Sequence, residues 1–247
     1  MKNSAIVRFG KFLVIAGIGF TCWATQAATY PGNGGTGFGG PLGTGSLTLT
    51  DDGTTVIGTF TRGTGDHTDF LVMYIDSISG GLTTTIGIND TADENRQSIS
   101  GGFGGSFVNF ASGFETDYAI SLYNDLSTSG GLWTTIDGNN MPFVDAVNLS
   151  GGGKSAPSYT FSFDLAGIGL TPNAGDAFKF VVTYTASSGF RSDEAIGSGV
   201  EPGNPGSNPI TFTGFETYTS VPEPSACLLL VLGLSALGLI IRVRRRA

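Results

Sequence analysis

The segment Phe178-Lys-Phe-Val-Val-Thr-Tyr-Thr185 decides the fold class that we expect for this chain. Aromatic and β-branched residues dominate it, and its apolar and polar residues partly alternate, as in a strand with one buried face. Tyr159-Thr-Phe-Ser-Phe163 has the same pattern, and residues 70–75 and 118–123 are equally rich in these residue types. These four segments predict the main strands of a β-sheet.

Shorter segments extend the pattern along the chain, at residues 46–50, 54–60, 82–88, 106–110, 132–136, 143–149 and 210–218. Clusters of Gly, Asn, Asp and Ser separate them, and between the two apolar ends no stretch has a convincing helical period. Short strands with Gly-rich turns are typical of all-β domains. We therefore predict an antiparallel β-sandwich of jelly-roll type, with its main domain at residues 46–196.

The segments that flank this domain are expected to be mobile connections. Residues 28–45 form a Gly-rich linker, and residues 197–209 form a loop in which Pro and Gly recur. Neither composition favours a helix or a central strand. Residues 210–220 would then supply a final edge strand and a short spacer.

The first 27 residues have the three parts of a secretory signal peptide. Lys2, Arg8 and Lys11 precede the apolar residues 12–20, and Ala24-Thr-Gln-Ala-Ala28 supplies small residues for cleavage. Cleavage after Ala27 fits the small-residue rule better than cleavage one residue later. We expect export, with signal peptidase as the first processing enzyme.

Residues 221–247 form an ordered three-part segment. Val221-Pro-Glu-Pro224 comes first, and its prolines favour an extended, accessible backbone. Residues 226–241 carry no charge and would span roughly 24 Å as a helix, which is short for a permanent membrane span. Basic residues beside an apolar helix stay on the cytoplasmic side, and four follow here: Arg242, Arg244, Arg245 and Arg246.

This segment resembles the PEP-CTERM sorting signal of Gram-negative bacteria, in which a Pro-Glu-Pro triad, a transmembrane helix and an Arg-rich tail follow one another. Val221, Pro222, Glu223 and Pro224 match the motif position by position. The resemblance implies processing by an exosortase of an inner-membrane precursor that is anchored through residues 226–243. It also implies delivery to the outer surface or extracellular matrix, with exopolysaccharide or biofilm. An ordinary tail anchor is the alternative.

The exported part of the chain is strongly acidic. Residues 28–221 hold five basic and 19 acidic side chains, a formal charge of −14 against −8 for the whole chain. Such a surface repels nucleic acid and anionic lipid, so we expect no nucleic-acid partner, although solubility alone explains the charge equally well. Both cysteines, Cys22 and Cys227, lie in the apolar terminal segments, so no intramolecular disulfide can stabilise the exported body.

Residues suited to catalysis are few, and we expect neither an enzyme nor a cofactor. His67 is the only histidine, and its polar setting, Asp66-His-Thr-Asp69, predicts an exposed loop. A multi-histidine metal site is therefore impossible within the chain. Two carboxylate pairs would suit glycoside hydrolysis if they shared a cleft, although such residues are usually solvated surface: Asp137 with Asp145, and Glu115 with Asp117.

Calcium is a more plausible ligand than a transition metal. Asp90, Asp93 and Glu94 concentrate hard oxygen donors in one presumed loop, which makes them weak candidates for Ca²⁺. Their spacing does not match the EF-hand loop. Asp51-Asp-Gly53 is better explained as a turn between two strands.

The body also resembles carbohydrate-binding β-sandwiches of the DOMON and family-nine binding-module type. The residues that carry this resemblance are Asp117-Tyr-Ala-Ile-Ser-Leu-Tyr123, Tyr159–Phe163, Gly175-Asp-Ala-Phe-Lys-Phe-Val-Val182 and Ser192-Asp-Glu-Ala-Ile196. The resemblance implies aromatic platforms for sugar rings, and Trp133 is the best candidate because an exposed indole stacks on a sugar face. Packing of Trp133 in the core is the alternative.

Two classes of function therefore compete for the body. The leading hypothesis is a non-enzymatic cell-surface or matrix protein that an exosortase processes. The alternative is a secreted carbohydrate-binding module or carbohydrate-active enzyme that uses the same sorting signal. Both have extracellular polysaccharide as the expected partner.

Overall fold

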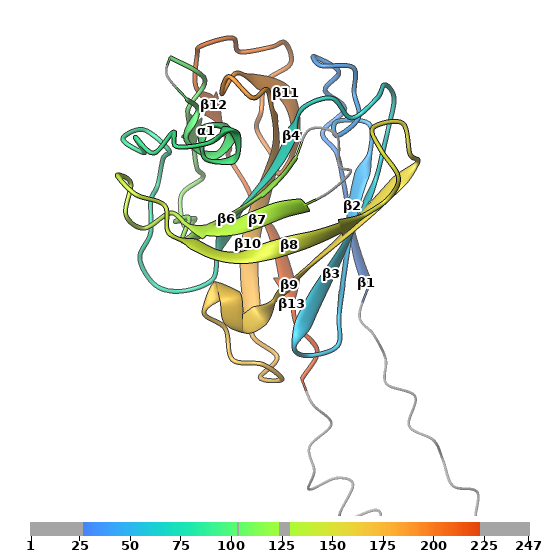
Figure 1. Ribbon diagram of the computed structural model, residues 1–247, viewed down its shortest axis with the longest axis vertical. Helices are drawn as coiled ribbons and strands as arrows, with labels where there is room; N and C mark the ends of the chain where they lie inside the picture. The colour runs from blue at the N-terminus through green and yellow to red at the C-terminus, as the bar shows by residue number, and fades with distance from the viewer. Residues whose placement is uncertain (1–26, 103, 124–128, 223–247) are drawn as a thin grey trace, which may run out of the picture.

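The computed structural model describes residues 27–102, 104–123 and 129–222 (Figure 1). The predicted signal peptide up to residue 26 and the chain from Glu223 onward lie outside the described residues. The structure is nearly all-β, which confirms the predicted fold class. The strands are β1 (Ala27–Pro31), β2 (Ser46–Asp51), β3 (Thr55–Thr61), β4 (Phe70–Asp76), β5 (Val108–Asn109), β6 (Tyr118–Leu122), β7 (Ser129–Thr134), β8 (Phe143–Ser150), β9 (Ser158–Asp164), β10 (Ala177–Thr185), β11 (Arg191–Ile196), β12 (Ile210–Thr211) and β13 (Glu216–Thr219).

Eleven of these strands form one antiparallel sheet in the spatial order β1-β2-β3-β9-β8-β7-β6-β4-β10-β11, with β13 beside the first half of β10. The two faces of the expected sandwich are thus parts of one continuous sheet that curves back on itself (Figure 1). The short strands β12 and β5 pair in parallel as a separate sheet.

The two edges of the large sheet meet, so the sheet nearly closes into a barrel. The Asn33 backbone N–H donates to the Ala195 carbonyl at 2.9 Å, and the Asn33 side chain donates to the Asp193 carbonyl at 2.7 Å. Near this seam the Tyr30 hydroxyl donates to the Thr217 carbonyl at 2.8 Å. Hydrogen bonds across the seam protect edge strands that would otherwise be open to pairing with other chains.

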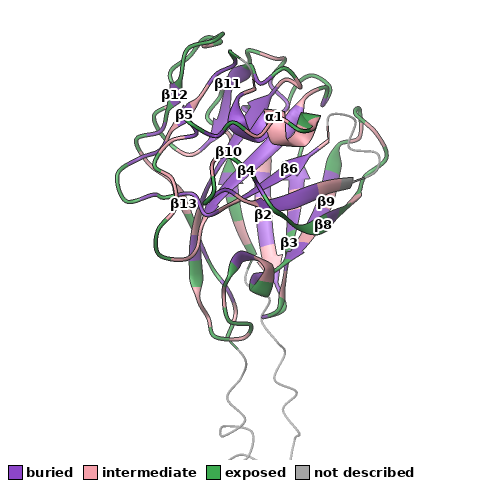
Figure 2. Cartoon of the chain, turned by 60° about the vertical axis from the view of Figure 1, so that its left-hand side comes forward, coloured by how far each residue is buried: buried purple, intermediate pink, exposed green. Residues whose placement is uncertain are grey.

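Two apolar cores lie on opposite sides of the sheet. Alternating residues of β4 point to each, and this strand is buried along nearly its whole length (Figure 2). The inner core receives Leu71, Met73 and Ile75, and the outer core receives Phe70, Val72 and Tyr74. The helix α1 (Glu94–Ser100) and the β5–β12 pair cover the outer core, to which they contribute Ile99, Val108 and Ile210.

Residues 28–45 are not a mobile linker, which corrects the prediction for this segment. Residues 27–31 form β1, and the following Gly-rich chain wraps around the buried carboxylate of Glu194. That carboxylate accepts hydrogen bonds from four backbone N–H groups, at 2.9 to 3.2 Å: those of Phe38, Gly40, Leu42 and Gly43. Glycine allows this close approach, because a Cβ at Gly43 would lie 2.0 Å from the Gly35 carbonyl oxygen.

The predicted loop at residues 197–209 lies against the same region instead of moving freely. The Gly203 N–H donates to the Asp193 carboxylate at 2.7 Å, and the Asn204 side chain donates to the Gly37 carbonyl at 2.9 Å. These hydrogen bonds satisfy polar groups of the loop at 197–209, which has few apolar residues to bury.

Several elements differ from the sequence-based expectation. The strands β1 and β11, the helix α1 and a 3₁₀-helix at Leu165–Ile168 are absent from the predicted elements. Residues 82–88 form isolated bridges and turns in place of a strand, and the predicted strand at 210–218 is divided into β12 and β13. Asp93 caps α1 by accepting a hydrogen bond from the Arg96 N–H, and Gly101 ends the helix in the left-handed conformation. An Asp before the helix and a Gly after it are the local signal that reveals α1.

Candidate functional site

The chain enters its C-terminal motif at one end of the barrel, where Asp51 holds it. Asp51 ends β2, and this residue is 3% exposed. One carboxylate oxygen accepts the Tyr218 hydroxyl at 2.5 Å, and the other accepts the Val221 N–H at 3.0 Å and the Gly53 N–H at 2.8 Å. Burial raises the pKa of Tyr218, and the adjacent Asp51 carboxylate raises it further, so this hydroxyl stays a donor at physiological pH.

The residues on either side of Val221 are also held by the body. Ser220 is buried, and both its N–H and its hydroxyl donate to the Asp176 carbonyl at 2.9 Å. Pro222 lies against Gly175, where an added Cβ would come within 3.2 Å of the proline Cβ. The predicted spacer before the motif is therefore part of the fold, and the first two motif residues contact the barrel.

The remaining parts of the predicted sorting segment lie outside the described residues. These are Glu223, Pro224, the apolar run at 226–243 and the arginines Arg242, Arg244, Arg245 and Arg246. Within residues 27–102, 104–123 and 129–222, which the structure describes, no helix combines the length and the apolar character needed to cross a membrane.

A second feature is an uncharged row of hydroxyl side chains on the outer face of the sheet. It crosses five adjacent strands in register, from Thr29 on β1 through Thr48, Thr59 and Thr160 to Ser150 on β8. Adjacent strands are about 4.8 Å apart, so the row is about 19 Å long. We call these five residues the hydroxyl row.

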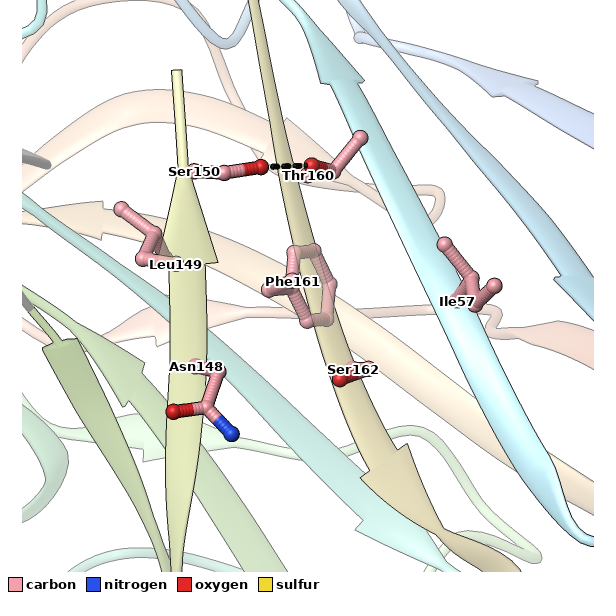
Figure 3. Close-up of a pocket in the computed structure, with 7 residues that line it drawn as sticks. All are labelled: Ile57, Asn148, Leu149, Ser150, Thr160, Phe161 and Ser162. Carbon is pink, nitrogen blue, oxygen red and sulfur yellow. Dashed lines mark hydrogen bonds between the residues drawn. The ribbon is translucent and has the colours of Figure 1, made fainter. Parts of the chain in front are cut away.

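A shallow groove of about 230 Å³ lies beside this row, between β3, β9 and β8 (Figure 3). Ile57 exposes 45% of its surface there, and Ser162 and Asn148 lie opposite it in register on the next two strands. The Ser150 and Thr160 hydroxyls are hydrogen-bonded to each other at its edge (Figure 3). Leu149 and Phe161 also line the groove, which therefore combines apolar contacts with neutral donors and acceptors.

Trp133 is part of the outer core and not an exposed platform. It is 4% exposed, its ring packs edge-on against Phe143 at 5.8 Å, and the Arg96 guanidinium lies 5.8 Å from its centre. Core packing, the alternative for this residue, is what the structure shows. Its position on β7, between α1 and β8, gives it this role.

The carboxylates of the three Ca²⁺ candidates do not point toward a common binding site. Arg96 forms ion pairs with both Asp90 and Asp93, and Asp90 also accepts the Met141 N–H at 2.8 Å. Glu94 instead accepts the Tyr123 hydroxyl at 2.8 Å. Among the described residues, no group of three or more His, Cys, Asp or Glu side chains is placed to hold a metal.

His67 is fully buried, which corrects the prediction of an exposed loop histidine. Its ring lies 5.1 Å from that of Tyr184 and 5.7 Å from that of Phe60, because the loop after β3 folds inward over the inner core. The sequence signal was misleading, since the flanking Asp and Thr residues are polar while the ring itself faces aromatic side chains.

The predicted carboxylate pairs are used in other ways. Asp117 is buried and accepts the Ser77 and Ile78 N–H groups at 2.9 Å, whereas Glu115 is exposed. Asp137 and Asp145 are both exposed and accept hydrogen bonds from nearby backbone N–H groups. The Asp51 site has no local sequence signal, because its partners lie 167 and 170 residues further along the chain.

These observations define a class of protein: a β-barrel-like body whose folded edge leads directly into a C-terminal sorting segment. Residues 220–246 match the PEP-CTERM protein-sorting motif. The chain therefore carries a PEP-CTERM sorting signal, which implies export, a membrane-anchored precursor and processing by an exosortase for the cell envelope. No curated protein and no solved structure matches the chain.

Proposed function

We propose that the processed protein remains at the outer surface or in the extracellular matrix and binds a neutral polysaccharide there, without catalysing a reaction. The hydroxyl row carries this proposal. Hydroxyl side chains both donate and accept hydrogen bonds, so a row of them is complementary to the hydroxyl groups of a sugar chain.

Charge narrows the class of polysaccharide. The body carries a formal charge of −14, which repels anionic polymers over about a Debye length at physiological ionic strength. The five side chains of the row are uncharged, and so are Ile57, Ser162 and Asn148 beside it. A neutral chain can lie on this face without burying an unpaired charge.

Apolar contact supports the same proposal. Ile57 is a large exposed side chain in an otherwise polar face, and burying it against the apolar face of a sugar ring would remove it from water. Because the groove is shallow, it suits an extended chain lying along the sheet better than a small ligand.

A substitution at the centre of the row tests this proposal. Thr59→Lys places a long charged side chain on the face, and we expect affinity for a neutral polysaccharide to fall about tenfold. The matched control is Thr217→Lys on β13, an exposed threonine outside the row, which should leave the affinity unchanged. Binding is measured on immobilised neutral and anionic polysaccharides, with an assay for released reducing ends.

The proposal predicts binding to at least one neutral polysaccharide and no release of reducing ends above the buffer control. Equal binding by wild type and Thr59→Lys would show that the hydroxyl row does not contribute to polysaccharide binding. Hydrolysis by the wild-type protein would instead favour a carbohydrate-active enzyme. Cleavage by signal peptidase after Ala27 stays a prediction, which N-terminal sequencing of the exported protein can check.

A further inference from the structure

The sorting motif offers few backbone donors to an enzyme. An extended peptide is usually recognised through its main-chain hydrogen bonds, with pockets for alternate side chains. Pro222 and Pro224 have no N–H, so Val221 and Glu223 carry the only two backbone donors between positions 221 and 224. In the folded body, the Val221 N–H already donates to Asp51 at 3.0 Å.

The body holds this part of the motif on several sides. Gly53 follows Asp51 in the turn, and an added Cβ there would lie 3.2 Å from the Val221 carbonyl oxygen. The Asn173 N–H donates to the Gly53 carbonyl at 2.6 Å, which ties the loop at 171–176 to the same turn. Pro222 packs on Gly175 in that loop. We call the contacts of Asp51 with Val221 and of Gly175 with Pro222 the exit latch.

We propose that the exit latch gates processing: the exosortase acts on precursor molecules in which Val221 and Pro222 have left the barrel. While the latch is closed, one of the two backbone donors and one side of Pro222 are unavailable to the enzyme. Opening it needs only the loss of these contacts, since Tyr218 and Ser220 remain buried in the barrel. The latch therefore opens without unfolding of the body.

The gate slows processing because an enzyme that binds only the open form acts only on the open fraction of the precursor, so the processing rate scales with that open fraction. This inference concerns processing of the precursor by the exosortase, and it does not depend on what the hydroxyl row binds.

An insertion separates the motif from the latch while preserving the fold. In a variant with Gly-Ser-Gly-Ser between Ser220 and Val221, an inserted glycine takes the place of Val221, and its N–H can donate to Asp51. Val221 and Pro222 are then free. The matched control carries the same insertion between Gly152 and Gly153, in an exposed turn far along the chain from the exit.

Processing is followed by pulse-chase in a host with the matching exosortase, as loss of the Arg-rich tail by intact mass. Glu223→Ala supplies the unprocessed reference. We expect the exit insertion to shorten the precursor half-life at least about fivefold relative to wild type and to the control insertion. An unchanged or longer half-life would mean that the enzyme reads the motif in place against the barrel, and would overturn the proposal.

Two further measurements separate the latch from a simple effect of spacer length. Asp51→Asn keeps the chain length but replaces the charged acceptor by a weaker neutral one, so it should shorten the half-life by an intermediate factor. Because Asp51 is buried, the melting temperature of the variant is measured alongside, to show that its body stays folded at the temperature of the chase. A wild-type half-life for this variant would contradict the proposal. In full-length wild type, the Val221 amide should be protected from hydrogen exchange, and exchange at the rate of a free peptide would rule out the latch.

Discussion

Buried polar residues decide much of how this barrel holds together. Arg191 is fully buried in the outer core, and its guanidinium donates to neutral acceptors: the Ser106 and Ile99 carbonyls and the hydroxyls of Thr183, Thr185 and Tyr74. Burial lowers the pKa of Arg191, and its hydrogen bonds oppose this effect. The arginine thereby joins α1, β4 and β10 through one side chain.

Asp117 gives a prediction about pH. Burial raises its pKa above the ordinary 3.8, against the opposing hydrogen bonds from the Ile78 and Ser77 N–H groups. As the pH rises from 3.8 through the folded-state pKa, the unfolded chain releases the proton first, so folding stability falls. We expect the melting temperature of Asp117→Asn, relative to wild type, to be higher at pH 7 than at pH 3.

Asp52 provides the control of opposite sign for this prediction. Hydrogen bonds from Thr55 and Thr54 lower the pKa of its carboxyl group in the turn after β2. Its contribution to stability is therefore present above pH 3.8 and is lost as the pH falls through the folded-state value. Asp52→Asn should lose stability relative to wild type at pH 7, and a parallel response of the two variants would contradict the assignment for Asp117.

At the scale of elements, the long strands were predictable and the polar edges were not. The segments around β4, β6, β9 and β10 have dense apolar or alternating patterns, so their local sequence identifies them. In contrast, β11 reads Arg-Ser-Asp-Glu-Ala-Ile and is fully buried. A polar strand is buried only where other segments supply hydrogen bonds, and those partners come from residues 33–43, distant in sequence.

A substitution at Glu194 tests whether hydrogen bonds from the Gly-rich segment stabilise the buried strand β11. Glu194→Gln replaces one acceptor oxygen by an amide group that cannot accept the two N–H groups directed at it, so we expect a loss of about 3 kcal/mol in unfolding free energy. Urea unfolding measures this loss, and hydrogen exchange should show faster exchange at Leu42 and Gly43. The exposed Glu201→Gln serves as control, and equal stability of the two variants would show that the Gly-rich segment is held by other contacts.

At the scale of the whole molecule, the two cores share strands and cannot separate easily. β4 contributes to both cores on its opposite faces, and β10 does the same through Phe180 and Val181. After removal of the predicted signal peptide, Trp133 is the only tryptophan and reports on the outer core. Its fluorescence and the far-UV circular dichroism should therefore give the same urea midpoint, in one transition.

Separate midpoints would mean that the outer core, with α1 and the β5–β12 pair, opens before the barrel. Two adjacent valines offer a matched comparison. Val181→Ala removes two methyl groups from the outer core, and Val182→Ala removes the same atoms from the inner core. If the molecule is one cooperative unit, both variants shift the two signals together.

Both ends of the described chain lie at the same end of the barrel (Figure 1). Ala27 on β1 pairs with Thr50, the residue before Asp51, and Asp51 binds Val221. The predicted signal-peptide cleavage site and the sorting motif thus meet at one place. A precursor that is attached to the membrane by either end presents this same end of its body to it.

The sequence by itself determined the all-β class, the acidic and disulfide-free body and the sorting motif, because each depends on composition or on order along a short stretch. Only the tertiary structure decided that the Gly-rich segment encloses Glu194, that His67 and Trp133 are buried, and that Asp51 holds the motif against the barrel. These features depend on contacts between residues far apart in the chain, and the partners of a buried polar group are fixed only when the sheet closes.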